Sequence, residues 1–314
     1  MYTLRCGVLA FAFCAVTGGL SAQAGKPPVH EAFARAYKAS IYYKAVGKGP
    51  TVFVLHGGPG MDHRYIYDHL QKLTERYRLV FIDQRCTGSS RCTLDQKHVT
   101  IERFVDDIDI VRRHLGLQKI HLLGHSWGGL LAIHYTVRHP ANVRSLMLLN
   151  SSGLTGESQK KFFDNLESMR TEEEKKELEA IDANPAYIAG DVALQTRHGE
   201  LYARPYFFDP KKAKDMKYVP GPLTAKNGKT VRTWIWKFLL EYDLRRQAGL
   251  IRCPVLILHG DTDVIPLEVP EETNEVIKGS RITILKDTGH YSFVEKNEEV
   301  LKEIATFLKR VTGR

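Results

Sequence analysis

The chain of 314 residues has few cysteines and no long apolar run, and both shortages narrow the class of protein. Five cysteines are too few for a disulfide-stapled scaffold of this length. The unbroken apolar stretch at residues 6–16 is shorter than the roughly 20 residues that span a bilayer. With 43% hydrophobic and 26% charged residues, the composition is that of a globular protein, which excludes wholesale disorder and a multi-span membrane protein.

The formal net charge of +9 raises the question of an anionic partner such as nucleic acid. Between residues 154 and 243 there are 15 basic and 15 acidic side chains, so the positive excess is spread over the rest of the chain. No basic stripe with interleaved aromatic residues is present, and we therefore expect no nucleic-acid partner.

The N-terminus has the organisation of a secretory signal. Arg5 precedes the apolar run 6–16, and Ala22-Gln23-Ala24 is a suitable signal-peptidase site. We therefore predict a signal peptide at residues 1–24, export to the periplasm or the medium, and no stable membrane anchor after cleavage.

Export changes how the cysteines are interpreted. Three remain after cleavage, and in an oxidising compartment Cys86 and Cys92 are candidates for a disulfide that closes a short loop. Cys253 is expected to be a buried thiol. None of the three lies in a Cys/His pattern typical of a zinc site.

Short apolar runs alternate with helical patterns along the chain. The runs are nearly continuous in apolar character, as in parallel strands covered on both faces. They lie at residues 52–55, 79–82, 120–123, 146–149, 255–258 and 282–285. Apolar residues recur at three- and four-residue steps in 101–115 and 300–311, which is typical of amphipathic helices. This alternation predicts an α/β fold with a mostly parallel sheet flanked by helices.

The alternation stops between residues 154 and 243. This segment begins with charged, helix-like sequence and continues with proline, lysine and aromatic residues, without a convincing buried strand. We expect a helical cap at 154–243, inserted between two parts of an α/β core at 25–153 and 244–314. Such a cap would lie over the carboxyl edge of the sheet, where ligands bind in these folds.

The most specific motif is Gly-His-Ser-Trp-Gly at residues 124–128. It follows an expected strand and precedes an expected helix, the context in which Gly-x-Ser-x-Gly projects a nucleophilic serine above the sheet edge. We therefore expect Ser126 to be the nucleophile.

A serine hydroxyl needs a base and an acid that orients it, in the chain order serine, acid, histidine for this fold. The strand at 255–258 leads to Asp261 and Asp263, and the strand at 282–285 leads to His290. Asp263 is favoured over Asp261 because it lies far enough past the strand for a turn to aim its carboxylate back. Asp261 is the alternative, or it braces that turn.

A glycine-rich loop, His-Gly-Gly-Pro-Gly at residues 56–60, follows the first expected strand. Acyl transfer needs hydrogen-bond donors for the oxyanion, and glycines let backbone N–H groups approach the substrate. The N–H groups of Gly58 and Trp127 are the candidates. The loop has neither the Gly-Lys-Ser/Thr ending nor the Gly-x-Gly-x-x-Gly pattern of a phosphate-binding loop, which disfavours that alternative.

Together these fragments resemble the α/β-hydrolase fold over essentially the whole mature chain. The loop at 56–60 and Asp-Gln-Arg at 83–85 resemble the proline iminopeptidase (peptidase S33) family of serine peptidases. The resemblance implies a triad of Ser126, Asp263 and His290. It also implies an oxyanion hole made by Gly58 and Trp127, a helical cap, and no metal or cofactor.

The chain departs from that family at three places. His125 and Cys86 stand where the family usually has glycine, and Trp234-Ile235-Trp236-Lys237 does not reproduce its Trp-x-x-Trp-Glu stretch. Family members bind the substrate's α-amine through acidic cap residues. The candidates for that role are Glu200, Asp209 and Glu241, and the candidate wall residues are Tyr202, Tyr206, Phe207, Trp234 and Trp236.

The function expected from the sequence is that of an exported serine hydrolase. The resemblance implies a proline iminopeptidase-like aminopeptidase that releases N-terminal residues from short peptides. A carboxylesterase or lactonase acting on small acyl esters is the alternative, and a non-catalytic binding protein with the hydrolase fold is the third hypothesis. The expected partner is a small molecule or a short peptide.

Export predicts that the mature protein begins at Gly25. The measurement is the N-terminal sequence and intact mass of the protein recovered from its native cells. Recovery of the mature protein with residues 1–24 still attached would contradict export.

Overall fold

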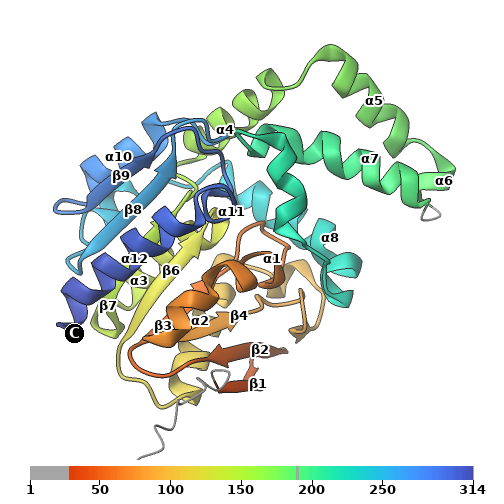
Figure 1. The fold of residues 1–314 in the computed structure, drawn as a ribbon. Coiled ribbons are helices and arrows are strands. Elements are labelled where there is room, and N and C mark those ends of the chain that lie inside the picture. The colour runs from red at the N-terminus through yellow and green to blue at the C-terminus, as the bar shows by residue number, and fades with distance from the viewer. Residues whose placement is uncertain (1–27, 189–190, 314) are drawn as a thin grey trace, which may run out of the picture.

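The computed structural model describes residues 28–188 and 191–313, so the predicted signal peptide at 1–24 lies outside the described residues. Nine strands form one sheet in the order β1-β2-β4-β3-β6-β7-β8-β9, with the short β5 paired to β2 (Figure 1). From β4 to β9 all neighbouring strands are parallel. The strands are β1 (Val29–Ala36), β2 (Ala39–Val46), β3 (Thr51–Leu55), β4 (Arg78–Ile82), β5 (Arg91–Cys92), β6 (Ile120–His125), β7 (Val143–Leu149), β8 (Val255–Gly260) and β9 (Arg281–Leu285).

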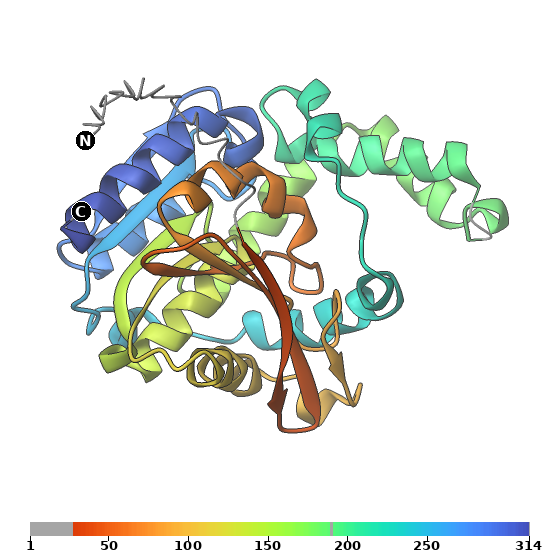
Figure 2. The same cartoon turned by 60° about the horizontal axis from the view of Figure 1, so that its bottom comes forward.

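The six apolar runs all form parallel strands, and the predicted α/β class is confirmed. The antiparallel hairpin of β1 and β2 at the sheet edge is an addition to that prediction (Figure 2). Strand β1 is largely exposed along its length, so its sequence has no continuous apolar run that would have indicated it.

Helices cover both faces of the sheet. Successive residues of β3 point to opposite faces, and Phe53 joins one hydrophobic cluster while Val54 joins the other. The first cluster includes the apolar faces of α2 and α3, and the second includes those of η1 and α12. The core helices are α1 (Arg64–Tyr67), η1 (Asp68–Glu75), η2 (Gln96–His98), α2 (Ile101–His114), α3 (Trp127–Arg138), η3 (Pro140–Asn142), α9 (Arg245–Ala248), α10 (Glu268–Val276), α11 (Ser292–Glu295) and α12 (Asn297–Thr312).

The segment between β7 and β8 is helical and extends away from the sheet (Figure 1). Its two ends lie side by side, because Thr155 and Asp243 form an isolated β-bridge. We call residues 154–243 the cap. Its helices are α4 (Gly156–Ser168), α5 (Glu172–Asp182), α6 (Pro185–Ile188), α7 (Val192–Ala203), η4 (Arg204–Tyr206), η5 (Pro210–Met216) and α8 (Pro222–Leu239).

Within the described ranges 28–188 and 191–313, no helix combines the length and the apolar character needed to cross a membrane.

Helix α8 lies directly against the core. Asn227 donates a hydrogen bond to the carbonyl of Cys86, and the Gly88 N–H donates to Thr224 Oγ1 at 2.7 Å. Cys86 and Cys92 are joined by a disulfide, with their Cα atoms 5.0 Å apart. The disulfide-closed loop therefore forms part of the surface on which α8 rests.

Helix α8 approaches the core backbone closely where two glycines face each other. A Cβ atom on Gly228 would lie 2.5 Å from the carbonyl oxygen of Gly60. Alanine is favoured over glycine in a helix interior by about 1 kcal/mol, so Gly228 stands in α8 against its helix propensity. We attribute the glycine at position 228 to the lack of room for a side chain between α8 and the Gly60 carbonyl.

Replacing the two mid-helix glycines of the cap with alanine should have opposite effects. In Gly199→Ala the new methyl group meets nothing within 4 Å, so the free energy of unfolding should rise by about 0.5–1 kcal/mol. In Gly228→Ala it should fall by about 1–3 kcal/mol, because the methyl group overlaps the core backbone. Denaturant unfolding of both variants measures the difference. Equal stabilisation by the two substitutions would contradict the close contact between α8 and the core.

Candidate active site

Ser126 lies at the sharp turn between β6 and α3. Its backbone has φ 55° and ψ −126°, a conformation that L-residues rarely adopt. The flanking glycines are required by close packing: a Cβ on Gly124 would overlap the Gly128 carbonyl, and one on Gly128 would overlap the carbonyl of Leu55. The turn leaves Ser126 on the wall of a cavity below the cap.

His290 lines the same cavity as Ser126 and is backed by a buried carboxylate. Its Nδ1 lies 2.9 Å from Asp263 Oδ1 and 3.1 Å from Oδ2. Burial acts to raise the pKa of Asp263, but the charges of His290 and His259, together with its hydrogen bonds, outweigh it and hold that pKa below its usual value. Asp263 is therefore ionised at neutral pH and accepts a hydrogen bond from the imidazole.

Asp261 has a different position from Asp263. Its Oδ1 accepts a hydrogen bond from the Thr288 N–H at 3.1 Å, which ties the loop after β8 to the loop after β9. This is the bracing role that the sequence offered as the alternative for Asp261.

Asn150 holds Asp263 in place and was missed by the sequence reasoning. Its Nδ2 donates to Asp263 Oδ2 at 2.7 Å and to the Gly289 carbonyl at 3.1 Å, while its Oδ1 accepts from Ser292 Oγ at 2.5 Å. Asn150 has φ 47°, a left-handed conformation that asparagine tolerates well. The available signal was its place directly after a strand whose end lies at the same sheet edge as Ser126.

His125 is buried beside Ser126 and both of its ring nitrogens have partners. The Gly57 N–H donates to the Tyr65 hydroxyl, so that hydroxyl donates its own proton to His125 Nδ1 at 2.7 Å. The opposite nitrogen, Nε2, then donates to the carbonyl of His290 at 3.1 Å. Burial lowers the pKa of His125 well below its usual value, in keeping with a neutral ring that links the loops around Ser126.

The two candidate oxyanion donors come from separate loops that Gln84 connects. Gly58 lines the cavity, and Trp127 begins α3, where the first N–H groups have no intrahelical partner. Gln84 donates from Nε2 to the carbonyl of His56 at 2.7 Å, and its Oε1 accepts from the Trp127 indole at 2.7 Å. The spacing between the glycine-rich loop and the start of α3 therefore depends on this amide.

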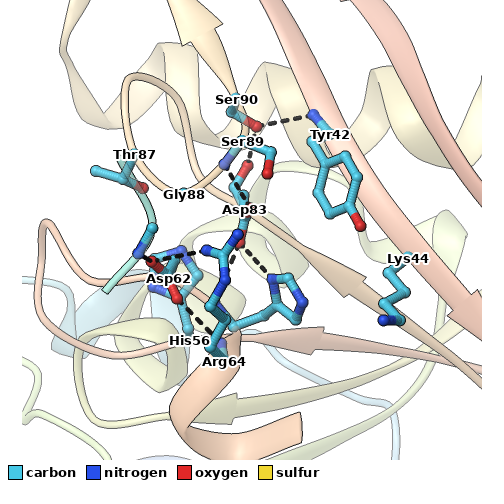
Figure 3. Close-up of polar contacts among 12 residues, drawn as sticks. Tyr42, Lys44, His56, Asp62, Arg64, Asp83, Thr87, Gly88, Ser89 and Ser90 are labelled. Carbon is cyan, nitrogen blue, oxygen red and sulfur yellow. Dashed lines mark hydrogen bonds and ion pairs between the residues drawn. The ribbon is translucent and has the colours of Figure 1, made fainter. Parts of the chain in front are cut away.

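Asp83 and Arg85, the neighbours of Gln84 in the Asp-Gln-Arg stretch, both form buried polar contacts with other segments of the core. Arg85 is buried and forms a two-pronged ion pair with Asp107, at 2.8 Å and 2.7 Å. Asp83 accepts from His63 Nδ1 at 2.6 Å and from the Ser89 N–H at 2.7 Å (Figure 3). All three residues of the stretch thus hold loops near the cavity without lining it.

Asp62, His63 and Asp83 place their ligand atoms within 4.8 Å of one another, a spacing that a metal ion could use. Protein donors already occupy this cluster (Figure 3). Asp62 Oδ2 accepts from the Gly221 N–H at 2.8 Å and lies 3.1 Å from a guanidinium nitrogen of Arg64. A guanidinium in this position repels a cation, so we interpret the cluster as an anchor for the start of α8.

The cavity has a volume of about 410 Å³, the size of a pocket for a small molecule. Ser126 and His290 line it together with residues from the glycine-rich loop and the cap. Its wall is rich in aromatic side chains: Phe162, Tyr202, Tyr206, Tyr218, Trp236 and Tyr291.

Only some of the predicted cap residues line this cavity. Tyr202, Tyr206 and Trp236 do, whereas Trp234 packs against the first hydrophobic cluster. The expectation for Trp234 is corrected by helix geometry, since residues two apart on a helix point in different directions. Phe207, another candidate wall residue, is buried in the second hydrophobic cluster instead.

The predicted acidic candidates lie away from the cavity wall. Glu200 is exposed and pairs with Arg197, and Glu241 is exposed beyond the end of α8. Asp209 caps η5. Among the described residues that line the cavity there is no carboxylate, and Arg232 is the cationic side chain that the cap contributes.

Comparison with known proteins identifies the family of the chain. Residues 50–297 match the family described as alpha/beta hydrolase fold. The chain is 30% identical over 286 residues to a proline iminopeptidase of Lactobacillus crispatus (strain ST1), covering 85% of this chain and 94% of that protein. It is 28% identical over 293 residues to a proline iminopeptidase of Saccharolobus solfataricus (strain ATCC 35092 / DSM 1617 / JCM 11322 / P2), covering 90% and 93%.

Solved structures share the fold at lower sequence identity. The crystal structure of proline iminopeptidase from Mycobacterium smegmatis aligns with a TM-score of 0.68 and 21% identity, over 90% of this chain and 98% of that one. The esterase EaEST from Exiguobacterium antarcticum aligns with a TM-score of 0.64 and 23% identity, over 89% and 100%.

Proposed function

The chain belongs to the α/β-hydrolase family. We propose that it is a serine hydrolase that releases N-terminal residues from short peptides. Hydrolysis of an acyl bond is supported by the positions of three side chains. Ser126 and His290 line the same cavity, and Asp263 is hydrogen-bonded to the imidazole of His290 from behind. The peptide substrate is supported by the relatives named proline iminopeptidase. The cavity volume of about 410 Å³ under the cap favours small substrates over long chains.

In this proposal Ser126 Oγ attacks the scissile carbonyl carbon and forms a tetrahedral intermediate. His290 takes the hydroxyl proton through Nε2, because its Nδ1 faces Asp263. The N–H groups of Gly58 and Trp127 stabilise the oxyanion. His290 then donates the proton to the leaving amine, and water releases the acyl group from Ser126 by the same steps.

Asp263 keeps the imidazole in the tautomer and orientation that this cycle needs. It stabilises the imidazolium that forms when Ser126 loses its proton. Because Asn150 and the Ile265 N–H occupy its oxygens at 2.7 Å and 2.8 Å, the carboxylate stays fixed while the charge on His290 changes.

Hydrolysis of small acyl esters or lactones is the second candidate, and one observation favours it. An enzyme that selects a protonated α-amine needs a carboxylate near the reacting bond, and the described cavity wall contains none. The chemistry at Ser126 would be the same, with an alcohol as the leaving group in place of an amine.

Export is also part of the proposal. The disulfide between Cys86 and Cys92 supports it, since such bonds persist in oxidising compartments and are rare in the cytosol.

A substrate panel separates the candidates. The purified mature protein is assayed with prolyl and other aminoacyl arylamides and with 4-nitrophenyl esters of small acids. We expect arylamide cleavage that falls about a thousandfold or more in Ser126→Ala, because the nucleophile is lost.

The other outcomes of this panel are equally informative. Ester cleavage without arylamide turnover would refute the peptidase assignment and leave the esterase. Activity retained in Ser126→Ala would contradict the serine mechanism itself. No turnover of either class, with no labelling by a fluorophosphonate, would indicate a binding protein.

A further inference from the structure

Arg232 brings a positive charge from the cap to the cavity that holds Ser126 and His290. Helix α8 presents one face there, since Ala225, Arg232 and Trp236 all line the cavity and are spaced seven and four residues apart. Arg232 thus lies in a run of cavity-facing positions, and is half-buried rather than freely exposed.

The guanidinium of Arg232 has no counter-ion in the part of the chain that the structure describes. No ion pair or hydrogen bond joins it to any residue of 28–188 or 191–313, and no Asp or Glu of these ranges lines the cavity. Helix α8 itself has no acidic residue; its other charges are lysines.

The nearby buried carboxylates already have partners. Asp62 accepts from Gly221 and Thr224 and pairs with Arg64. Asp263 lies behind His290, with both oxygens bonded. Neither carboxylate forms an ion pair with Arg232, and the described cavity wall offers it no other carboxylate.

The surroundings of Arg232 would strengthen its ion pair with an anionic ligand. The cavity wall is mainly aromatic, and electrostatic interactions are stronger there than in water.

Arg232 lines the same cavity as the proposed reacting groups, Ser126 and His290. A substrate bound at Ser126 therefore has a guanidinium within the same small cavity, where a fork of N–H donors matches a planar carboxylate.

We propose that Arg232 is a specificity residue that binds a carboxylate of the substrate. This deepens the proposed function and rests on it. The carboxylate has two possible sources: the C-terminus of a very short peptide, on the leaving-group side, or a free acid on the acyl group of an ester. The shared chemistry is a carboxylate attached a few bonds from the scissile carbonyl.

Two matched substrate pairs distinguish the sources. The first pair is prolyl-alanine and prolyl-alanine amide, which differ in the charge of the C-terminus, with release of proline as the readout. The second is the 4-nitrophenyl monoester of glutaric acid and 4-nitrophenyl valerate, which differ in the charge at the end of the acyl chain. The value of kcat/KM is measured for all four.

We expect the wild-type enzyme to prefer the charged member of at least one pair, and Arg232→Met to lower kcat/KM for that member by about 10- to 100-fold. The neutral member of the same pair should change less than about threefold. Arg232→Lys should fall between, since it keeps the charge and loses the fork.

The matched control is Lys229→Met, which removes a charge from an exposed position on the same helix. It should leave all four kcat/KM values within about twofold of wild type. Equal kcat/KM for both members of each pair, or an equal loss for both in Arg232→Met, would overturn the role of Arg232. Continued hydrolysis of the neutral substrates would show in that case that the proposed function still stands. If no substrate is hydrolysed and Ser126 is not labelled, the function and this inference fall together.

Discussion

The paired and buried carboxylate of Asp263 is the constraint on which the rest of the site depends. A carboxylate without solvent is costly unless its oxygens accept hydrogen bonds, and here His290, Asn150 and the Ile265 N–H supply them. Those donors come from the loops that follow β9, β7 and β8. The same bonds that satisfy the charge therefore bring the ends of three strands together and aim His290 toward the cavity of Ser126.

A second constraint sets the shape of that cavity. Helix α8 contacts the core closely enough that Gly60 and Gly228 have no room for side chains, and Asp62 bonds to the start of the helix. The cap is thereby held over Ser126 at its inner end, while α5 to α7 extend away from the core (Figure 1). The residues of α8 that line the cavity are thereby held in place relative to Ser126.

Much of the core could be predicted from the sequence, because buried parallel strands leave continuous apolar runs, and the glycines around Ser126 leave a spaced motif. The exposed strand β1 left no such run. No sequence motif marks Asn150 either. Its hydrogen bond to Asp263 depends on strand ends that are distant in sequence and meet only in the folded sheet. In the cap, the family resemblance suggested an acidic residue among Glu200, Asp209 and Glu241, and the aromatic content suggested Trp234. None of these four residues lines the cavity, because the direction of each side chain depends on how the cap packs on the core. Side-chain direction in a helix can only be assigned once the register of its contact with the core is known.

The most direct test of the account is the rate at which a fluorophosphonate labels Ser126 in Asp263→Asn and in its matched control, Asp261→Asn. We expect the Asp263 variant to be labelled at least about a thousandfold more slowly than wild type, because its imidazole is no longer held in the right tautomer. The Asp261 variant should label within a few-fold of wild type. Equal rates for the two variants, or labelling at a residue other than Ser126, would contradict it.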